Sequence, residues 1–541
     1  MSGERRLQWL APGALALAFL PFLGGDFVWD DVPLIRHNPA MISASGYREL
    51  VTRDLWGQAT GAPSQLYHPL PMLSLWLQTQ LHGLHIVPLR LVNLGLHALV
   101  GWLLVGLLTR LGVARLLALA TGLAVLVHPS VCEPVMWLTG RHDTLGVIGV
   151  LLALRAWPAP DRIRRRKLQA FMSGCLLALA FLSKEPYIVG PALLAAFAAW
   201  QSWRVARSPL AADSGPVLAD LARIGRHTSA ELALALLPLC AALALRRALG
   251  ISLGSTQLHA TLLEHARSYA SITAHYGVQL LGLQNGSTIL HYQPLSWPLV
   301  AATWLVLLGV LVLLTWATVR SPRGEPVYAT ALFGYVWFLV ALAPHVISVP
   351  TIGLYGNRYG YCALLGLAIS MAALSTRLPA LAPHQARIAW GLYAALLTIT
   401  ALRTGIDAAR WRDNETLYSA DVARDPRDGY ALYHLATAVL TKHGCESALP
   451  LFVHATELAP RYERPYHNVT GCLINLGRPA EARPFAERSV ALAPHNARAH
   501  YNLAVTLAAR DERAEAALHL QTALRLEPGF APAQSASAAL K

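Results

Sequence analysis

Long apolar runs constrain the fold of this chain more than any other feature of its sequence. A helix needs about 20 mostly apolar residues to cross the hydrocarbon core of a bilayer, and roughly eleven segments of the 541-residue chain meet that requirement. They lie at approximately 7–23, 88–108, 113–129, 143–157, 168–183, 188–203, 230–249, 296–318, 327–346, 360–375 and 388–404. The chain is 55% hydrophobic and only 14% charged, with a mean hydropathy of +0.41. These values indicate a polytopic, all-α membrane protein.

Positive charges predict how these segments are oriented. Arginines gather in alternate short loops, such as RIRRRK at 162–167, and such loops stay on the cytoplasmic side. The opposite loops are expected outside, at residues 24–87, 130–142, 184–187, 250–295 and 347–359, together with everything after about 405. The formal charge of +14 therefore reflects topology and predicts no nucleic-acid partner. Arginine is the default cation, as in a GC-rich bacterial genome, so we expect a bacterial protein of the inner membrane. Arg5 and Arg6 predict that its N-terminus is cytoplasmic.

A 34-residue period appears in the last third of the chain. Pro426, Pro460, Pro494 and Pro528 are spaced by 34 residues, and Ala448, Ala482 and Ala516 keep the same step. Small residues where two helices touch, and proline after the second helix, are typical of tetratricopeptide repeats. We therefore predict a membrane domain at 1–405 and an exterior, periplasmic domain of about three repeats plus a partial one at 406–541. The concave face of such a solenoid binds other chains, which predicts that it holds an acceptor or a partner protein.

The unusual polar stretches all fall in or beside the exterior loops. They are the pair Asp30 and Asp31, YHPLPMLSLW at 67–76, HPSVCEPVMWLTGRHD at 128–143, SKEP at 183–186 and YGNRYGY at 355–361. Charged groups at the edge of the bilayer are costly unless paired or hydrated, so this convergence predicts one polar cavity at the outer interface. Taken singly, each has a plainer explanation, such as a solvated acidic pair or, for His142, a packing residue. Lys184 is harder to explain in that way, since lysine occurs only four times in the chain.

These stretches carry a resemblance to a known family. In order along most of the chain, GDFVWDDVPLIRHNP, LYHPLPMLSLW, LVHPSVCEPVMWLTGRHDTL, FLSKEP and NRYGY are followed by periodic helices. This order resembles the transmembrane and tetratricopeptide-repeat-containing O-mannosyltransferases, of the GT-C class of glycosyltransferases. The resemblance implies inverting transfer of a mannose-like hexose from a polyprenyl-phosphate donor to a hydroxyl of an exported protein or envelope glycan. The sequence departs from the pattern at His68, where relatives usually have arginine, and in its small number of repeats.

The resemblance also implies roles for individual residues. An acidic residue of the first exterior loop acts at the reaction centre, so Asp30 or Asp31 would accept the proton of the attacking hydroxyl, with Asp30 slightly favoured. Cations would stabilise the leaving phosphate, and the candidates are Arg141, Lys184 and Arg358. The other candidate substrate-binding residues are Tyr67, His68, Glu133, Asp143, Glu185 and Asn357. No residue is assigned to a metal, but a divalent cation is left open because Asp30, Asp31, Glu133 and Asp143 share one side of the membrane.

Two other functions stay open on the sequence alone. The chain could be a non-enzymatic, membrane-anchored tetratricopeptide scaffold for envelope protein assembly, or a transporter. Eleven spans are more than an anchor needs, and the charges in mid-span expected of a transporter are scarce. The six cysteines are scattered without metal-like spacing, which indicates neither a disulfide framework nor a structural metal. The ordered exterior motifs favour the enzyme.

Overall fold

The computed structural model describes residues 14–15, 17–60, 64–159, 165–207, 217–251, 261–282, 290–352, 354–377 and 382–540. The chain divides into two compact units, Met1–Arg412 and Asp413–Lys541. This division falls a few residues after the predicted domain boundary. In the described ranges nearly all regular structure is helical, and the one strand pair joins β1 (Leu290–His291) to β2 (Leu354–Tyr355) antiparallel, with Leu290 opposite Tyr355. The prediction of an all-α fold is therefore confirmed.

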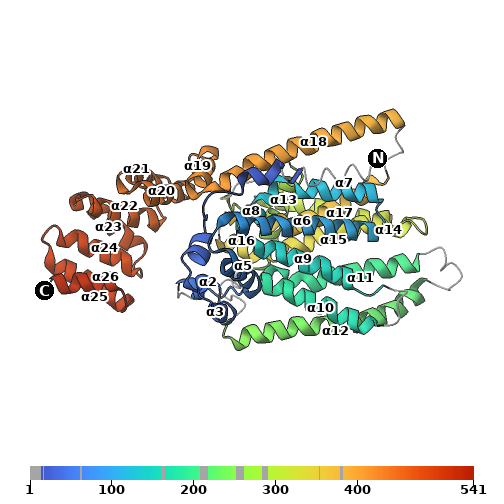
Figure 1. Cartoon of the computed structure of the whole chain (residues 1–541), viewed down its shortest axis with the longest axis horizontal. Helices are drawn as coiled ribbons and strands as arrows, with labels where there is room; N and C mark the ends of the chain where they lie inside the picture. Colours follow the sequence, from blue (N-terminus) through green and yellow to red (C-terminus); the bar gives the residue numbers. More distant parts are fainter. Residues whose placement is uncertain are drawn as a thin grey trace. The chain divides into compact units, whose positions relative to one another are not determined.

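The first unit is a bundle of long helices, with the short helices α2, α3 and α5 gathered at one end (Figure 1). Its elements up to residue 156 are η1 (Leu20–Phe22), η2 (Val32–Arg36), α2 (Pro39–Ile42), α3 (Tyr47–Thr52), α4 (Gly57–Thr60), α5 (Pro69–His82), α6 (Ile86–Arg110), α7 (Arg115–Leu126), η3 (Pro129–Val131), α8 (Cys132–Met136) and α9 (Arg141–Ala156). The remaining elements are α10 (Arg166–Ser183), η4 (Glu185–Val189), α11 (Gly190–Ala206), α12 (Val217–Ala248), α13 (Leu262–Leu280), α14 (Trp297–Arg320), α15 (Val327–Leu342), α16 (His345–Ile352), η6 (Asn357–Gly360), α17 (Tyr361–Ser375), α18 (Pro383–Ala409) and η7 (Arg410–Arg412).

Six helices in the described part of the chain are long and apolar enough to cross a membrane. They are Ile86–Arg110, Thr228–Ala248, Trp297–Arg320, Val327–Pro350, Asn357–Ser375 and Pro383–Arg412, and the bent pair Arg115–Leu126 and Pro129–Met136 adds a seventh if it is one span. The chain is a multi-pass membrane protein, as predicted. The predicted segments at 143–157, 168–183 and 188–203 coincide with the shorter helices α9, α10 and α11, and residues 7–13 and 16 of the segment at 7–23 lie outside the described residues. The count of eleven spans stays a prediction.

Small residues bring the helices of the bundle together, while large apolar residues face outward. A Cβ on Gly334 of α15 would lie 2.6 Å from the carbonyl oxygen of Gly366 in α17, so only glycine fits at this contact. Close approach of this kind is a common way for membrane helices to associate. Leu305 of α14 and Leu392 of α18 are 76% and 68% exposed. Such faces suit a lipid environment.

The loop that carries the acidic pair is fixed by an apolar cluster and by one buried arginine. Residues from 27 to 55 pack on α5 and α6 through side chains that include Phe27, Leu34, Met41, Leu75 and Leu89. Arg90 of α6 is fully buried and donates to five carbonyl oxygens, those of Leu23, Gly24, Asp26, Met136 and Trp411, at 2.5–3.3 Å. Three segments far apart in the sequence therefore meet at one guanidinium.

A bend after α7 turns the chain into the middle of the unit. The axis changes by 58° between Arg115–Leu126 and Pro129–Met136, where proline lacks the N–H that a continuous helix needs. His128 Nδ1 accepts a hydrogen bond from the Ser130 amide at 3.2 Å and caps the new turn. The bend places Glu133 of α8 at a fully buried position, next to the loop that leads into α9.

The second unit consists of paired helices. The pairs are α20 (Gly429–His443) with α21 (Cys445–Leu458), α22 (Glu463–Asn475) with α23 (Pro479–Leu492), and α24 (Ala497–Ala508) with α25 (Arg513–Leu526); α19 (Asn414–Arg424) precedes them and α26 (Ala531–Leu540) follows. Ala448, Ala482 and Ala516 are fully buried within these pairs, as the 34-residue period requires. The prediction of a tetratricopeptide α-solenoid is confirmed.

Candidate active site

The two adjacent carboxylates of the first exterior loop have different surroundings. Asp31 is fully buried and accepts hydrogen bonds from the backbone amides of Leu138 and Thr139 at 3.1 and 3.0 Å. The Asp30 side chain is only half-buried, and its carboxylate accepts no hydrogen bond from any residue that the structure describes. Trp29, just before it, has a φ of +54°, a left-handed conformation that bulky residues rarely adopt. Asp31 therefore holds a turn, whereas Asp30 is presented by a strained backbone.

Both carboxyl groups bind protons more readily than usual. Burial raises the pKa of Asp30 to about 6, and the positive charge of Arg358 limits the rise. Burial also raises the pKa of Asp31 to about 7, while the amides of Leu138 and Thr139 and the charge of Arg90 oppose it. A general base works best when its pKa lies near the operating pH. The environment of the loop therefore suits proton transfer.

Arg358 of η6 lies beside this loop and is held on several sides. Its guanidinium forms an ion pair with the fully buried Glu133, and its backbone amide donates to Glu133 Oε2 at 3.3 Å. The Arg358 Cζ atom is 5.2 Å from the centre of the Trp29 ring and 5.0 Å from that of Trp137. These two indoles stack on each other at 5.2 Å. The predicted residues Asp30, Glu133 and Arg358 thus meet around a pair of tryptophans.

Lys184, at the end of α10, forms the second cationic centre. Its Nζ donates to both carboxylate oxygens of Asp143 at 2.8 and 2.7 Å, and the two side chains are 12% and 6% exposed. Lys184 Nζ also lies 5.4 Å from the ring of Tyr359, the residue after Arg358. Asp143, Arg358 and Tyr359 line a common small cavity of about 10 Å³, enough for about one water molecule. Arg358 and the carboxylate partner of Lys184 therefore border the same space.

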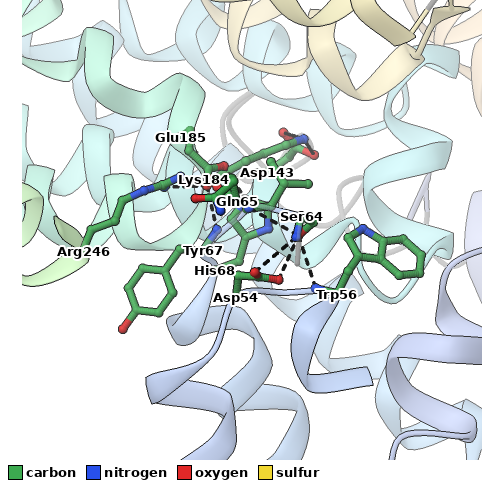
Figure 2. Close-up of polar contacts among 11 residues, drawn as sticks. Asp54, Trp56, Ser64, Gln65, Tyr67, His68, Asp143, Lys184, Glu185 and Arg246 are labelled. Atoms are coloured by element: carbon green, nitrogen blue, oxygen red, sulfur yellow. Dashed lines mark hydrogen bonds and ion pairs between the residues drawn. The ribbon is translucent and has the colours of Figure 1, made fainter. Parts of the chain in front are cut away.

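Glu185 is the centre of a third polar cluster, drawn in Figure 2. Its Oε1 accepts hydrogen bonds from the Tyr67 amide at 2.8 Å and from Arg246 Nη1 at 2.7 Å, and its Oε2 lies 2.5 Å from His68 Nε2. Burial opposes the charge of Glu185, but His68, the Tyr67 amide and Arg246 together lower its pKa to about 2. Glu185 thus stays ionised and holds the YHP stretch.

Arg246 is a member of this cluster that the sequence analysis missed. It comes from α12 on the opposite side of Glu185 from Tyr67 and His68 (Figure 2), is 2% exposed, and donates also to the carbonyl oxygen of Gln65. The available signal was an arginine pair at 246 and 247 that ends an apolar helix. That pattern is also typical of a cytoplasmic helix end, so it did not indicate a buried ion pair.

Three predicted ligand-binding residues are engaged inside the fold. Arg141 is fully buried and donates to the Asn93 side chain at 2.7 Å and to the Leu89 carbonyl at 3.0 Å. The Tyr67 hydroxyl donates to the carbonyl of Val51 at 2.7 Å, and the Asn357 side-chain oxygen accepts from Gln279. These contacts favour structural roles. Contact of these three residues with a substrate stays a prediction.

Three of the four carboxylates that were considered for a divalent cation, all except Asp30, have other partners. Asp31 binds backbone amides, Glu133 pairs with Arg358 and Asp143 pairs with Lys184. In the part of the chain that the structure describes, no three histidine, cysteine, aspartate or glutamate side chains come together as metal ligands would. The residues present therefore do not fit a metal site, and no step below is routed through a metal.

Comparisons with known proteins bear on this arrangement. No protein-family model matches the chain. Among curated proteins, the O-mannosyl-transferase F38B6.6 of Caenorhabditis elegans is 30% identical over 148 residues, which are 26% of this chain and 21% of the relative. The O-mannosyl-transferase TMTC1 of Homo sapiens is 34% identical over 152 residues, 27% of this chain and 17% of the relative. This chain is similar to the protein O-mannosyl-transferases. The match spans only about a fifth of the length of these relatives.

Several of the solved structures that match are described as tetratricopeptide-repeat (TPR) proteins. The crystal structure of MamA is 17% identical, with a TM-score of 0.23, over 26% of this chain and 81% of that one. A thermophilic TPR protein from Thermus thermophilus is 19% identical, with a TM-score of 0.21, over 28% of this chain and 95% of that one. TM-scores of this size give no information about the fold beyond the helix pairs described above.

Proposed function

We propose that this chain is a membrane glycosyltransferase of the GT-C type in the inner membrane of a bacterium. It moves a mannose-like hexose from a polyprenyl-phosphate donor to a hydroxyl group of an exported protein or envelope glycan, on the exterior face. The observation that supports this most directly is the contrast within the acidic pair. Asp31 is tied to two backbone amides, while Asp30 is half-buried beside Arg358 with its pKa raised to about 6.

The reaction is a single displacement in which Asp30 is the base. The acceptor hydroxyl attacks the anomeric carbon, and its proton passes to the Asp30 carboxylate as the new bond forms. The bond from the anomeric carbon to the phosphate oxygen breaks at the same time, and that oxygen keeps the electron pair. Attack opposite the leaving group inverts the configuration. Asp31 holds the turn at Leu138 and Thr139 in place and moves no proton.

Arg358 and Lys184 stabilise the departing phosphate. Negative charge grows on the phosphate as the bond breaks, and cations aimed at it bind the transition state more tightly than the ground state. Glu133 and Asp143 fix the two cations, and each cation has more N–H donors than its carboxylate partner can use. Arg141 is less suited, because its donors serve Asn93, Ser74 and Leu89 inside the fold.

The tetratricopeptide unit brings the acceptor to the membrane unit. Such arrays bind extended chains on their concave surface, and an exported polypeptide is the acceptor that would need one. The prenyl tail of the donor needs only a groove between helices that face lipid.

Transfer by the purified protein tests the proposal. We expect the full chain in proteoliposomes to move radiolabelled mannose from polyprenyl-phosphate mannose to peptides of exported proteins, and the Asp30→Asn variant to be inactive. Mass spectrometry of exported glycoproteins and envelope glycans should show hexose missing in deletion cells. Wild-type protein without transfer, together with unchanged glycans in the deletion strain, would favour the scaffold function instead.

A further inference from the structure

Two neighbouring histidines in the described part of the membrane unit have buried ring nitrogens without a hydrogen-bond partner. His68 Nδ1 and His142 Nε2 have no hydrogen-bond partner among the described residues. Both side chains are buried, with only 5% of their surface exposed, so bulk water does not supply one. Their rings meet edge to face, with centroids 4.6 Å apart. Trp137 Nε1 and Thr139 Oγ1, in the turn just before α9, are also buried and unpaired. A buried polar group without a partner is costly and calls for an explanation.

Other buried histidines of the chain are hydrogen-bonded. His97 pairs with the Tyr361 hydroxyl at 2.8 Å and the Leu126 carbonyl at 3.0 Å, and His345 Nδ1 lies 3.2 Å from Ser348 Oγ. The His142 ring, in contrast, forms no hydrogen bond with any described residue. The sequence favoured a packing role for His142, but leucine or phenylalanine would pack at this position as well as histidine does. The imidazole is therefore better explained by a ligand.

We propose that His68 Nδ1 and His142 Nε2 form a hydrogen-bonding subsite for the hydroxyl groups of the donor hexose. This inference rests on the proposed glycosyl transfer and extends it to the recognition of the sugar. A neutral imidazole offers one donor and one acceptor, and a hydroxyl group offers the same. Because a hydroxyl group both donates and accepts, it can pair with either ring nitrogen, and a sugar offers several such groups.

The surroundings of His142 keep that ring neutral. Burial, followed by the charges of neighbouring groups that include His68, Lys184 and Arg358, lowers the pKa of His142 well below its usual value. His68 is held from its other nitrogen by Glu185 at 2.5 Å, and Glu185 is held by Arg246. This chain of contacts fixes the direction in which His68 Nδ1 points (Figure 2).

Lipid binding tests the subsite without any need for transfer. We would measure binding of polyprenyl-phosphate mannose and of the same polyprenyl phosphate without sugar to the full chain in nanodiscs. The wild-type protein should prefer the mannosylated lipid. His142→Leu should weaken binding of that lipid roughly three- to tenfold, the effect of one lost hydrogen bond, and leave binding of the bare lipid unchanged. His142→Gln should keep part of the preference, and His85→Leu, the same change at an exposed histidine, should keep all of it.

The outcomes separate this inference from the proposed function. Equal binding of both lipids by the wild type, or equal weakening of both by His142→Leu, would overturn the sugar subsite. If His142→Leu raised only the KM for the acceptor peptide, the ring would bind a hydroxyl group of the acceptor. That result would also overturn the sugar subsite. A preference for the mannosylated lipid that depends on His142, in a protein that transfers no sugar, would support the subsite and refute the transferase.

Discussion

Exchange of Asp30 for asparagine removes a proton acceptor and little else. The Asp30 carboxylate accepts no hydrogen bond from the described residues, so the change strands no buried partner, and we expect the free energy of unfolding to change by about 0.5 kcal/mol or less. Loss of a general base lowers a rate by roughly 10²- to 10⁴-fold, which corresponds to about 3 to 5.5 kcal/mol of transition-state stabilisation. Asp30→Asn should therefore be stable and inactive.

The same exchange at Asp31 should give the opposite result. Asparagine has one side-chain oxygen, whereas the Asp31 carboxylate uses two to accept from Leu138 and Thr139 at 3.1 and 3.0 Å. One of these buried amides would face an NH2 group and lose its acceptor, which costs about 1–3 kcal/mol. Asp31→Asn should lower the melting temperature and the yield of folded protein. The molecules that do fold should still transfer sugar.

The assay compares initial rates of labelled hexose transfer at equal concentrations of folded protein, with thermal melts of the same samples. Because the base must be unprotonated, the wild-type kcat/KM should rise about tenfold per pH unit below pH 6 and level off above it, near the pKa of about 6 for Asp30. More than about a tenth of the wild-type rate in Asp30→Asn would refute the assignment. So would a stable but inactive Asp31→Asn.

Other expected outcomes follow from the ion pairs and the topology. Arg358→Ala leaves the fully buried Glu133 without its cation and should cost about 3–5 kcal/mol of stability. The double variant Arg358→Met, Glu133→Gln should melt near the wild-type temperature but use the donor poorly. Normal turnover by the double variant would mean that Arg358 is structural only. Reporter fusions after Lys167 should be cytoplasmic and those after Arg410 exterior, and a cytoplasmic second fusion would remove the shared compartment of the motifs. The pKa of Glu185 is lowered to about 2, so the stability that its ion pairs supply is fully present above about pH 4.5 and is lost as the pH falls towards 2. Melting temperatures measured over a pH series check this. A melting temperature that stays constant over that range would contradict the ion pairing.

Patterns that are local in the sequence predicted most of the fold. An apolar run of membrane length and a 34-residue period each specify a helix or a helix pair without reference to the rest of the chain. The side of the membrane was predicted from arginines in short loops, and that rule placed Asp30, Glu133, Lys184 and Arg358 in one region before any contact was known. The structure brings Asp30, Glu133 and Arg358 together around Trp29 and Trp137, and Lys184 lies beside Tyr359, the residue after Arg358.

Contacts between distant helices could not be predicted in the same way. Arg246 meets Glu185 across 61 positions of sequence, and this pairing depends on how α12 packs against α10. Arg141 was a candidate for binding phosphate because it is a cation in an exterior stretch, and the structure shows that its guanidinium joins α9 to α5 and α6. A sequence motif records that a charge is needed, but whether it serves a ligand or a neighbouring helix is decided by packing.

The contacts of Arg90 have a consequence for how the protein is made. Its guanidinium binds the start of the acidic loop at Leu23, Gly24 and Asp26, and also the carbonyl of Trp411, which lies 321 positions later in the chain. Because a ribosome supplies the N-terminal end first, the loop waits for its last anchor until α18 has been inserted. A nascent chain would hold every candidate catalytic side chain and still lack an ordered site.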